Sequence, residues 1–178
     1  MSINLWIIFQ KIHGSKLIVH SSKLMAQNLD KTDIRILQLI QEDAQLTLKE
    51  IAQSINLSLT PTHERIKRME QEGIIDKYVT ILNKKKLGKL LVVYCNVTLD
   101  KQTQNNFVEF EEAITHFPEV VECSVVSGGF DYLMKVIAQD MEAYNEFYQK
   151  KLSVLQSVAH ISSFFVMSEV KSTTVLPI

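Results

Sequence analysis

The sequence is poor in cysteine and has no excess of positive charge. Its two cysteines, Cys95 and Cys123, are too few among 178 residues for a disulfide framework. Both lie in apolar, strand-like segments, which indicates reduced, buried thiols in a cytoplasmic protein. The formal net charge is −1, so any contact with nucleic acid must come from a local patch rather than from the whole surface.

Long hydrophobic runs are also missing. The apolar stretch 3–9 is far shorter than the roughly 20 residues that span a membrane. No Lys or Arg precedes it, as one would in a secretory signal. Met25 begins a stretch, MAQNLDKTD, that is typical of a natural start. We therefore interpret residues 1–24 either as a non-native upstream start or as a loosely attached N-terminal extension, with an additional packed helix as the alternative.

Motifs for cofactor or covalent chemistry are missing as well. The sequence contains no Walker loop, dinucleotide fingerprint or nucleophilic-serine elbow. Its histidines do not have the spacing of a metal site, so we expect neither a metal nor a cofactor; they are His13, His20, His63, His116 and His160. The hydrophobic content of 46% and charged content of 22% are ordinary for a folded globular chain. The length allows two small domains.

Residues 25–82 form the first predicted domain, and it begins with two short helices. Hydrophobic side chains at helical spacing predict these helices over residues 29–43 and 48–55. Asp30 and Thr47 are the predicted caps. Each is followed three residues later by a carboxylate, as in a capping box.

A third helix is predicted after a tight turn. Asn56 in this turn tolerates the left-handed backbone conformation. Thr60 or Pro61 marks the start of the helix, with Thr60 as its cap, and Gly73 marks its end. Its inward stripe consists of Thr62, Ile66 and Met69. Two helices joined in this way are the unit that places a recognition helix in the DNA major groove.

The third helix carries a cluster of cations that suits double-stranded DNA. Helix N-terminal turns offer donors to base edges, while longer cationic side chains reach phosphates. The alternative is a solvated helix face with Glu64 and Arg68 as an i,i+4 ion pair. The coincidence of a capped helix, a turn and a proline-started helix favours DNA binding. The predicted DNA-binding residues are Ser58, Thr60, Pro61, His63, Arg65, Lys67 and Arg68.

The remainder of the chain predicts a second domain after a short linker. Residues 83–89, NKKKLGK, are polar and charged, which is typical of a linker. Residues 90–178 then show strand patterns over 90–99, 120–126, 132–138 and 158–167, and helical patterns over 103–117 and 141–152. The order β-α-β-β-α-β predicts a ferredoxin-like domain, an antiparallel sheet with two helices on one face. The predicted fold class is therefore α+β.

The loop between the two middle strands is the second candidate site. Gly128 and Gly129 allow backbone N–H groups to approach a ligand closely, and Asp131 beside them suits an ammonium group. An ordinary Gly-Gly hairpin is the alternative, and the pattern alone favours it.

These motifs resemble the Lrp/AsnC family of bacterial and archaeal transcriptional regulators. The resemblance is carried by LDKTDIRIL, LSLTPTHERIKRMEQEGII, VSGGFDY and FFVMSEVK. It implies an N-terminal winged helix-turn-helix followed by a C-terminal domain that senses a ligand and forms oligomers. It also implies homodimers that assemble into octamers.

The resemblance further implies a small amino-acid effector at the interface between dimers. The matching positions are Val125, Gly128, Gly129, Phe130, Asp131, Met141, Phe164, Phe165 and Val166. Phe164 and Phe165 are bulkier than the aromatic and aliphatic pair of leucine-responsive members, so we expect a preference different from leucine. Leu59 stands where a proline is common in the family.

The predicted function is a sequence-specific, DNA-binding transcriptional regulator that a small amino acid modulates, and not an enzyme. We expect Arg65→Ala to abolish specific binding without unfolding the protein. One alternative is an architectural DNA-binding protein without an effector. Another is an enzyme similar to sirohaem decarboxylases. That enzyme would need histidines and basic residues converging in the second domain, and no arginine follows Arg68.

Overall fold

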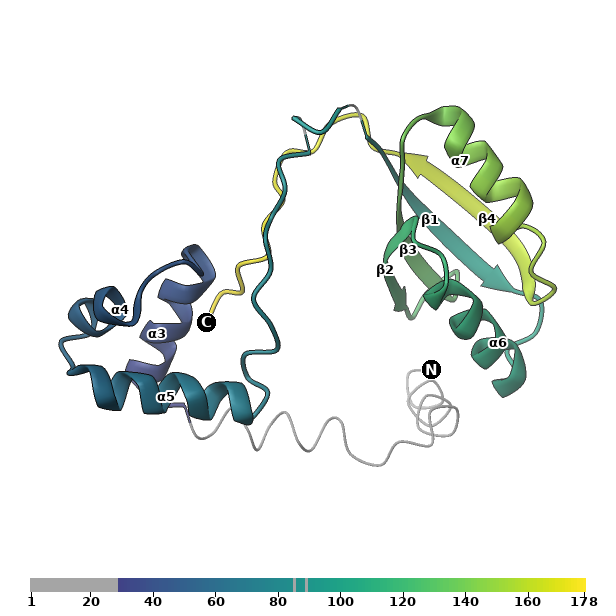
Figure 1. The fold of residues 1–178 in the computed structure, drawn as a ribbon. Coiled ribbons are helices and arrows are strands. Elements are labelled where there is room, and N and C mark those ends of the chain that lie inside the picture. Colours follow the sequence, from purple (N-terminus) through teal and green to yellow (C-terminus); the bar gives the residue numbers. More distant parts are fainter. Residues whose placement is uncertain (1–28, 85, 89) are drawn as a thin grey trace. The chain divides into compact units, whose positions relative to one another are not determined.

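The computed structural model describes residues 29–84, 86–88 and 90–178, so the predicted extension lies outside the described part of the chain. The described residues form two compact units (Figure 1). One consists of residues 29–81 together with Lys171–Ile178, and the other of residues 82–170. The predicted second domain, 90–178, includes these last eight residues, which in the structure pack with the first unit.

The first unit contains three helices, α3 (Lys31–Glu42), α4 (Leu48–Ser54) and α5 (Leu59–Gln71). Asp30 and Thr47 cap α3 and α4 in complete capping boxes, which confirms both predicted caps. The apolar faces of the helices meet in a small core built from Ile36, Leu37, Ile51 and Met69. Thr62 on α5 is also fully buried.

The turn before α5 follows the prediction at Asn56 but not at Thr60. Asn56 has a φ of 56°, the left-handed conformation expected for it. The predicted cap Thr60 is wrong, because Ser58 is the N-cap and Leu59 the first helical residue. The hydroxyl of Thr62 donates to Ser58 O at 2.9 Å, and the Thr62 N–H donates to the same oxygen. These bonds extend the helix one to two residues towards its N-terminus. Pro61 still lies in the first turn, where its missing N–H costs no helical bond.

The second unit is a four-stranded antiparallel sheet with helices on one face (Figure 1). The strands lie in the order β2-β3-β1-β4, and every pairing is antiparallel, as the ferredoxin-like prediction requires. They are β1 (Leu91–Leu99), β2 (Val120–Val125), β3 (Tyr132–Ala138) and β4 (Val158–Phe165). The helices are α6 (Gln104–Thr115) and α7 (Met141–Phe147), which continues as the π-helix η2 (Tyr148–Leu152).

Alternate residues of β1 and β3 build the core against the helices. Phe110, Tyr132 and Phe147 are its largest buried side chains. Cys95 is buried in this core as predicted, but the expectation of a buried Cys123 is wrong, because it lies exposed on the edge strand β2. Within the described part of the chain, no helix has the length and apolar content to cross a membrane.

Candidate functional site

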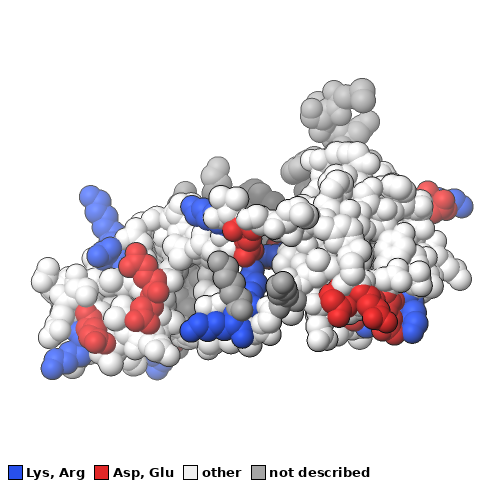
Figure 2. Space-filling model, turned by 90° about the horizontal axis from the view of Figure 1, so that it is seen from above, with Lys and Arg blue, Asp and Glu red and all other residues white. Residues whose placement is uncertain are grey.

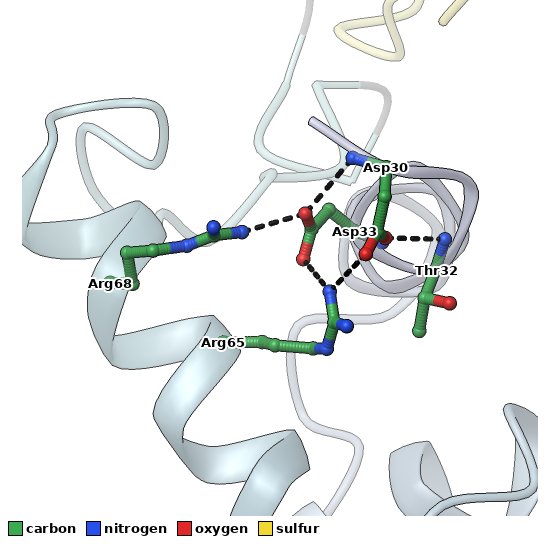
Figure 3. Close-up of polar contacts among 5 residues, drawn as sticks. All are labelled: Asp30, Thr32, Asp33, Arg65 and Arg68. Atoms are coloured by element: carbon green, nitrogen blue, oxygen red, sulfur yellow. Dashed lines mark hydrogen bonds and ion pairs between the residues drawn. The ribbon is translucent and has the colours of Figure 1, made fainter. Parts of the chain in front are cut away.

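Helix α5 has an inward face, two flanking arginines and an exposed stripe. Arg65 and Arg68 point towards the N-terminal end of α3, where two aspartates lie (Figure 3). Arg65 Nη1 donates to Asp30 Oδ2 at 2.7 Å and to Asp33 Oδ1 at 2.8 Å. Arg68 Nη2 donates to the other oxygen, Asp33 Oδ2, at 2.6 Å. We call these four side chains the aspartate–arginine brace.

Asp33 is the centre of the aspartate–arginine brace, since its side chain is only 1% exposed. Burial by itself would raise its pKa, but hydrogen bonds from Arg65, the Asp30 N–H and Arg68 outweigh burial and lower the pKa below 3.8. The carboxylate is therefore ionised and holds α5 against α3. The sequence indicates Asp33 only as a capping carboxylate, because nothing in the spacing of residues 30–33 identifies its arginine partners.

The aspartate–arginine brace separates the predicted DNA-binding cations into those paired with α3 and one that is not. Two of the three cations on α5 are engaged with α3, whereas Lys67 makes no ion pair within the described residues. The exposed stripe of α5 follows helical spacing i, i+3, i+4 and i+7. We call it the α5 stripe, and it consists of Thr60, His63, Glu64 and Lys67. Ser58 is also exposed, and Pro61 is half-buried.

Charge on one face of the molecule is mixed. On the face that Figure 2 shows, basic and acidic side chains of the described residues alternate without one broad basic patch. This agrees with the net charge of −1. Any specific DNA contact must therefore rest on the geometry of α5 more than on a long-range positive field.

The loop between β2 and β3 is anchored by Asp131. Asp131 is buried, with 7% of the residue exposed. One carboxylate oxygen accepts the Leu99 N–H at 2.8 Å and the other accepts Gln102 Nε2 at 2.8 Å. The backbone N–H of Asp131 donates to Val97 O. Asp131 thus fixes the end of the loop to β1, and the predicted role of holding an ammonium group stays a prediction.

The two glycines of this loop are exposed and conformationally ordinary. Neither Gly128 nor Gly129 has a positive φ, and no atom lies within 4 Å of the place where a Cβ would stand. The chain alone therefore gives no steric reason for glycine here. Both residues are exposed, so a molecule from outside can reach this part of the loop.

The predicted effector residues fall into two groups at opposite ends of β1. The loop end meets β1 at Val97, through the Asp131 N–H, whereas Val166 N–H donates to Val92 O. These two anchor points are five residues apart on the strand, or about 16 Å. Val125, Gly128, Gly129, Phe130 and Asp131 belong to the first group, and Met141, Phe164, Phe165 and Val166 to the second. Met141, in the second group, is 57% exposed.

Each of the two units matches a known protein-family model. Residues 29–76 match a winged helix-turn-helix DNA-binding model, and residues 92–176 match the Lrp/AsnC ligand binding domain. The chain is 35% identical over 150 residues to the Bkd operon transcriptional regulator of Pseudomonas aeruginosa, covering 84% of this chain and 98% of that protein. The chain belongs to the Lrp/AsnC family.

Other relatives place this family member among transcriptional regulators. It is 35% identical over 161 residues to the leucine-responsive regulatory protein of Escherichia coli K12, covering 90% of this chain and 98% of the relative. Among solved structures, a transcriptional regulator from Neisseria meningitidis in complex with L-Met is 33% identical. It has a TM-score of 0.80 and covers 84% of this chain and 97% of the other. This Lrp/AsnC protein is therefore a DNA-binding transcriptional regulator with a ligand-binding domain.

Proposed function

We propose that this regulator reads double-stranded DNA through the α5 stripe, with the aspartate–arginine brace setting the angle of the helix. Exposure at helical spacing supports this assignment, because only such side chains reach base edges without rearrangement. Ser58, Thr60 and Pro61 lie at the N-terminal end of α5 and His63 one turn later. Lys67, which has no ion-pair partner within the described residues, suits a phosphate. In this proposal Arg65 and Arg68 act on DNA through the orientation of α5.

The experiment that tests this assignment compares Lys67→Ala with His63→Ala by fluorescence anisotropy over a range of salt concentrations. Loss of one phosphate contact should weaken binding to all sequences alike and reduce the salt slope by about 1. His63→Ala should instead relax the preference for one sequence. Lys101→Ala, an exposed lysine of the other unit, removes the same charge as a control. Parent-like affinity and salt slope in Lys67→Ala would contradict the proposal.

We also propose that a small amino acid is the effector and that its site is shared between subunits. The separation of the two residue groups along β1 supports a shared site, since one chain cannot bring both groups around a molecule of that size. Gly128 and Gly129 are exposed, and backbone N–H groups of such a loop suit the carboxylate of an amino acid. The L-Met complex of the similar Neisseria meningitidis regulator supports this chemical class.

Self-association follows from the same proposal. The sheet face opposite α6 and α7 carries apolar side chains that the described chain leaves uncovered. They include Tyr94, at 36% exposure, and its cross-strand neighbour Phe164, at 54%. Half-buried Leu133 and Ile137 of β3 lie on the same face, because their neighbours along the strand enter the core. We propose that this open sheet face forms a homodimer and that dimers assemble further into octamers.

A further inference from the structure

The DNA-binding unit also contains the C-terminal segment of the same chain, Lys171–Ile178, which lies on α3. Gln41 contacts both backbone groups of one residue in this segment. Its Oε1 accepts the Leu176 N–H at 2.7 Å, and its Nε2 donates to Leu176 O at 3.4 Å. One helical turn earlier, Gln38 Nε2 donates to Ile178 O at 2.8 Å. We call Lys171–Ile178 the tail and the two glutamines the glutamine pair.

The glutamine pair recognises backbone rather than side chains. A glutamine amide offers a donor and an acceptor side by side, as the edge of a β-strand does. The apolar side chains of the tail stay largely open, with Leu176 at 66% and Ile178 at 49% exposure. Burial of apolar surface therefore contributes little, and the hydrogen bonds define the position of the tail.

The orientation of Gln38 is set by a third side chain of α3. Arg35 Nη1 donates to Gln38 Oε1 at 3.3 Å, which leaves the Nε2 group facing Ile178. The amide of Gln41 is likewise oriented by its own two bonds, because exchanging its oxygen and nitrogen would oppose both groups of Leu176. Both glutamines thus have their donor and acceptor sides set for an extended backbone.

We propose that the glutamine pair is a docking site for the tail of the same chain, and that docking gives the DNA-binding unit a second attachment to the ligand-binding domain. The first attachment is the chain that follows residue 81. The second begins at Val166, directly after β4, and reaches the docked tail at Lys171. Because Phe164, Phe165 and Val166 belong to the proposed effector site, this second attachment starts at that site. Two attachments restrict the unit more than one does.

Hydrogen exchange of the full-length protein tests the docking. We expect Gln38→Ala combined with Gln41→Ala to raise amide exchange at Leu176 by about tenfold or more, since its N–H loses its acceptor. Gln53→Ala, an exposed glutamine on α4, should leave exchange unchanged. Equal exchange in the double variant and the parent would overturn the docking site. Protection that disappears on dilution would assign the tail to a second copy and overturn docking within one chain.

DNA affinity tests the second attachment, which rests on the proposed function. On a DNA fragment that the parent binds, we expect the double variant to bind about 3- to 10-fold more weakly than Gln53→Ala, by anisotropy. Faster exchange with parent-like DNA affinity would overturn the attachment role. If the parent bound no DNA, the proposed function would fail, while the exchange result would still decide the docking.

Discussion

Asp33 is a carboxylate buried between two helices, and Arg65 and Arg68 balance its charge. Removing one partner of such a group leaves a buried charge without compensation, which costs more than an exposed ion pair contributes. Arg65→Ala is therefore expected to destabilise the DNA-binding unit as well as to impair DNA binding. Loss of binding in that variant alone would not identify Arg65 as a DNA contact.

The lowered pKa of Asp33 gives a pH prediction. Because the folded-state pKa lies below 3.8, the ionised carboxylate stabilises the fold above that pH, and this contribution is lost as the pH falls through the folded-state value. We expect urea unfolding of the parent to show stability that declines below about pH 4. Asp33→Asn should be less stable by about 2 kcal/mol at neutral pH and should decline less in acid.

Asp76→Asn is the matched control for Asp33→Asn, since it removes the same charge from an exposed position of the same unit. It should follow the parent at every pH. A neutral-pH stability of Asp33→Asn equal to that of the Asp76→Asn control would contradict the structural role of the brace.

At the level of helices, α4 and α5 begin differently. Thr47 and Glu50 close a reciprocal capping box on α4, with the Thr47 N–H donating to Glu50 Oε2 at 2.7 Å. Ser58 occupies the same position on α5 without a side-chain cap hydrogen bond. The hydroxyl of Ser58 is thus not committed to the helix start and remains exposed.

This difference predicts that Thr47→Ala and Ser58→Ala act on separate properties. Thr47→Ala should lower the free energy of unfolding by about 1 kcal/mol, whereas Ser58→Ala should change it by only about 0.3 kcal/mol. Ser58→Ala should instead reduce DNA affinity if the hydroxyl contacts DNA. Chemical denaturation and anisotropy on the same two variants separate the effects. Equal losses of stability would show that the Ser58 hydroxyl does form a cap hydrogen bond at the start of α5.

For the molecule as a whole, the open sheet face predicts an association that a single charge disrupts. Leu133→Glu places a carboxylate on that face, beside Asn96 and Ser124 on the neighbouring strands. Sedimentation velocity should give a smaller species than the parent, because an unpaired charge is costly to bury. Calorimetry with L-Met, the probe suggested by the Neisseria meningitidis complex, should lose any binding that the parent shows.

Val108→Glu is the control for this experiment. Val108 is 42% exposed on α6, a helix that covers the opposite face of the sheet. Its variant should keep the sedimentation coefficient of the parent. A parent-sized Leu133→Glu would exclude the open face as the dimer interface. Retained L-Met binding by a monomeric variant would exclude a site shared between subunits.

Local patterns predicted most elements of both units. Alternation of apolar residues identified β3 at its observed bounds, Tyr132–Ala138, and helical spacing with capping residues identified α3 and α4 within two residues. These features depend on neighbours a few positions apart, because helix and strand periods are short. The start of α5 was predicted too late. The Thr62 hydroxyl donates to Ser58 O, so the helix begins after Ser58 and Thr60 lies inside it.

The sequence predicted which segments carry the candidate sites, but not which side chains contact one another there. Periodicity selects the exposed positions of α5, yet it says nothing about which distant side chain neutralises a cation. Several hydrogen-bonded partners lie far apart in the sequence. The separation is 35 residues for Arg68 and Asp33, 29 for Asp131 and Gln102, and 135 for Gln41 and Leu176. Such partners are chosen when helices and strands pack, because hydrogen bonds act over about 3 Å regardless of separation along the chain. The cationic helix is thus a property of the sequence, whereas the partners of its arginines and the docked tail are properties of the tertiary structure.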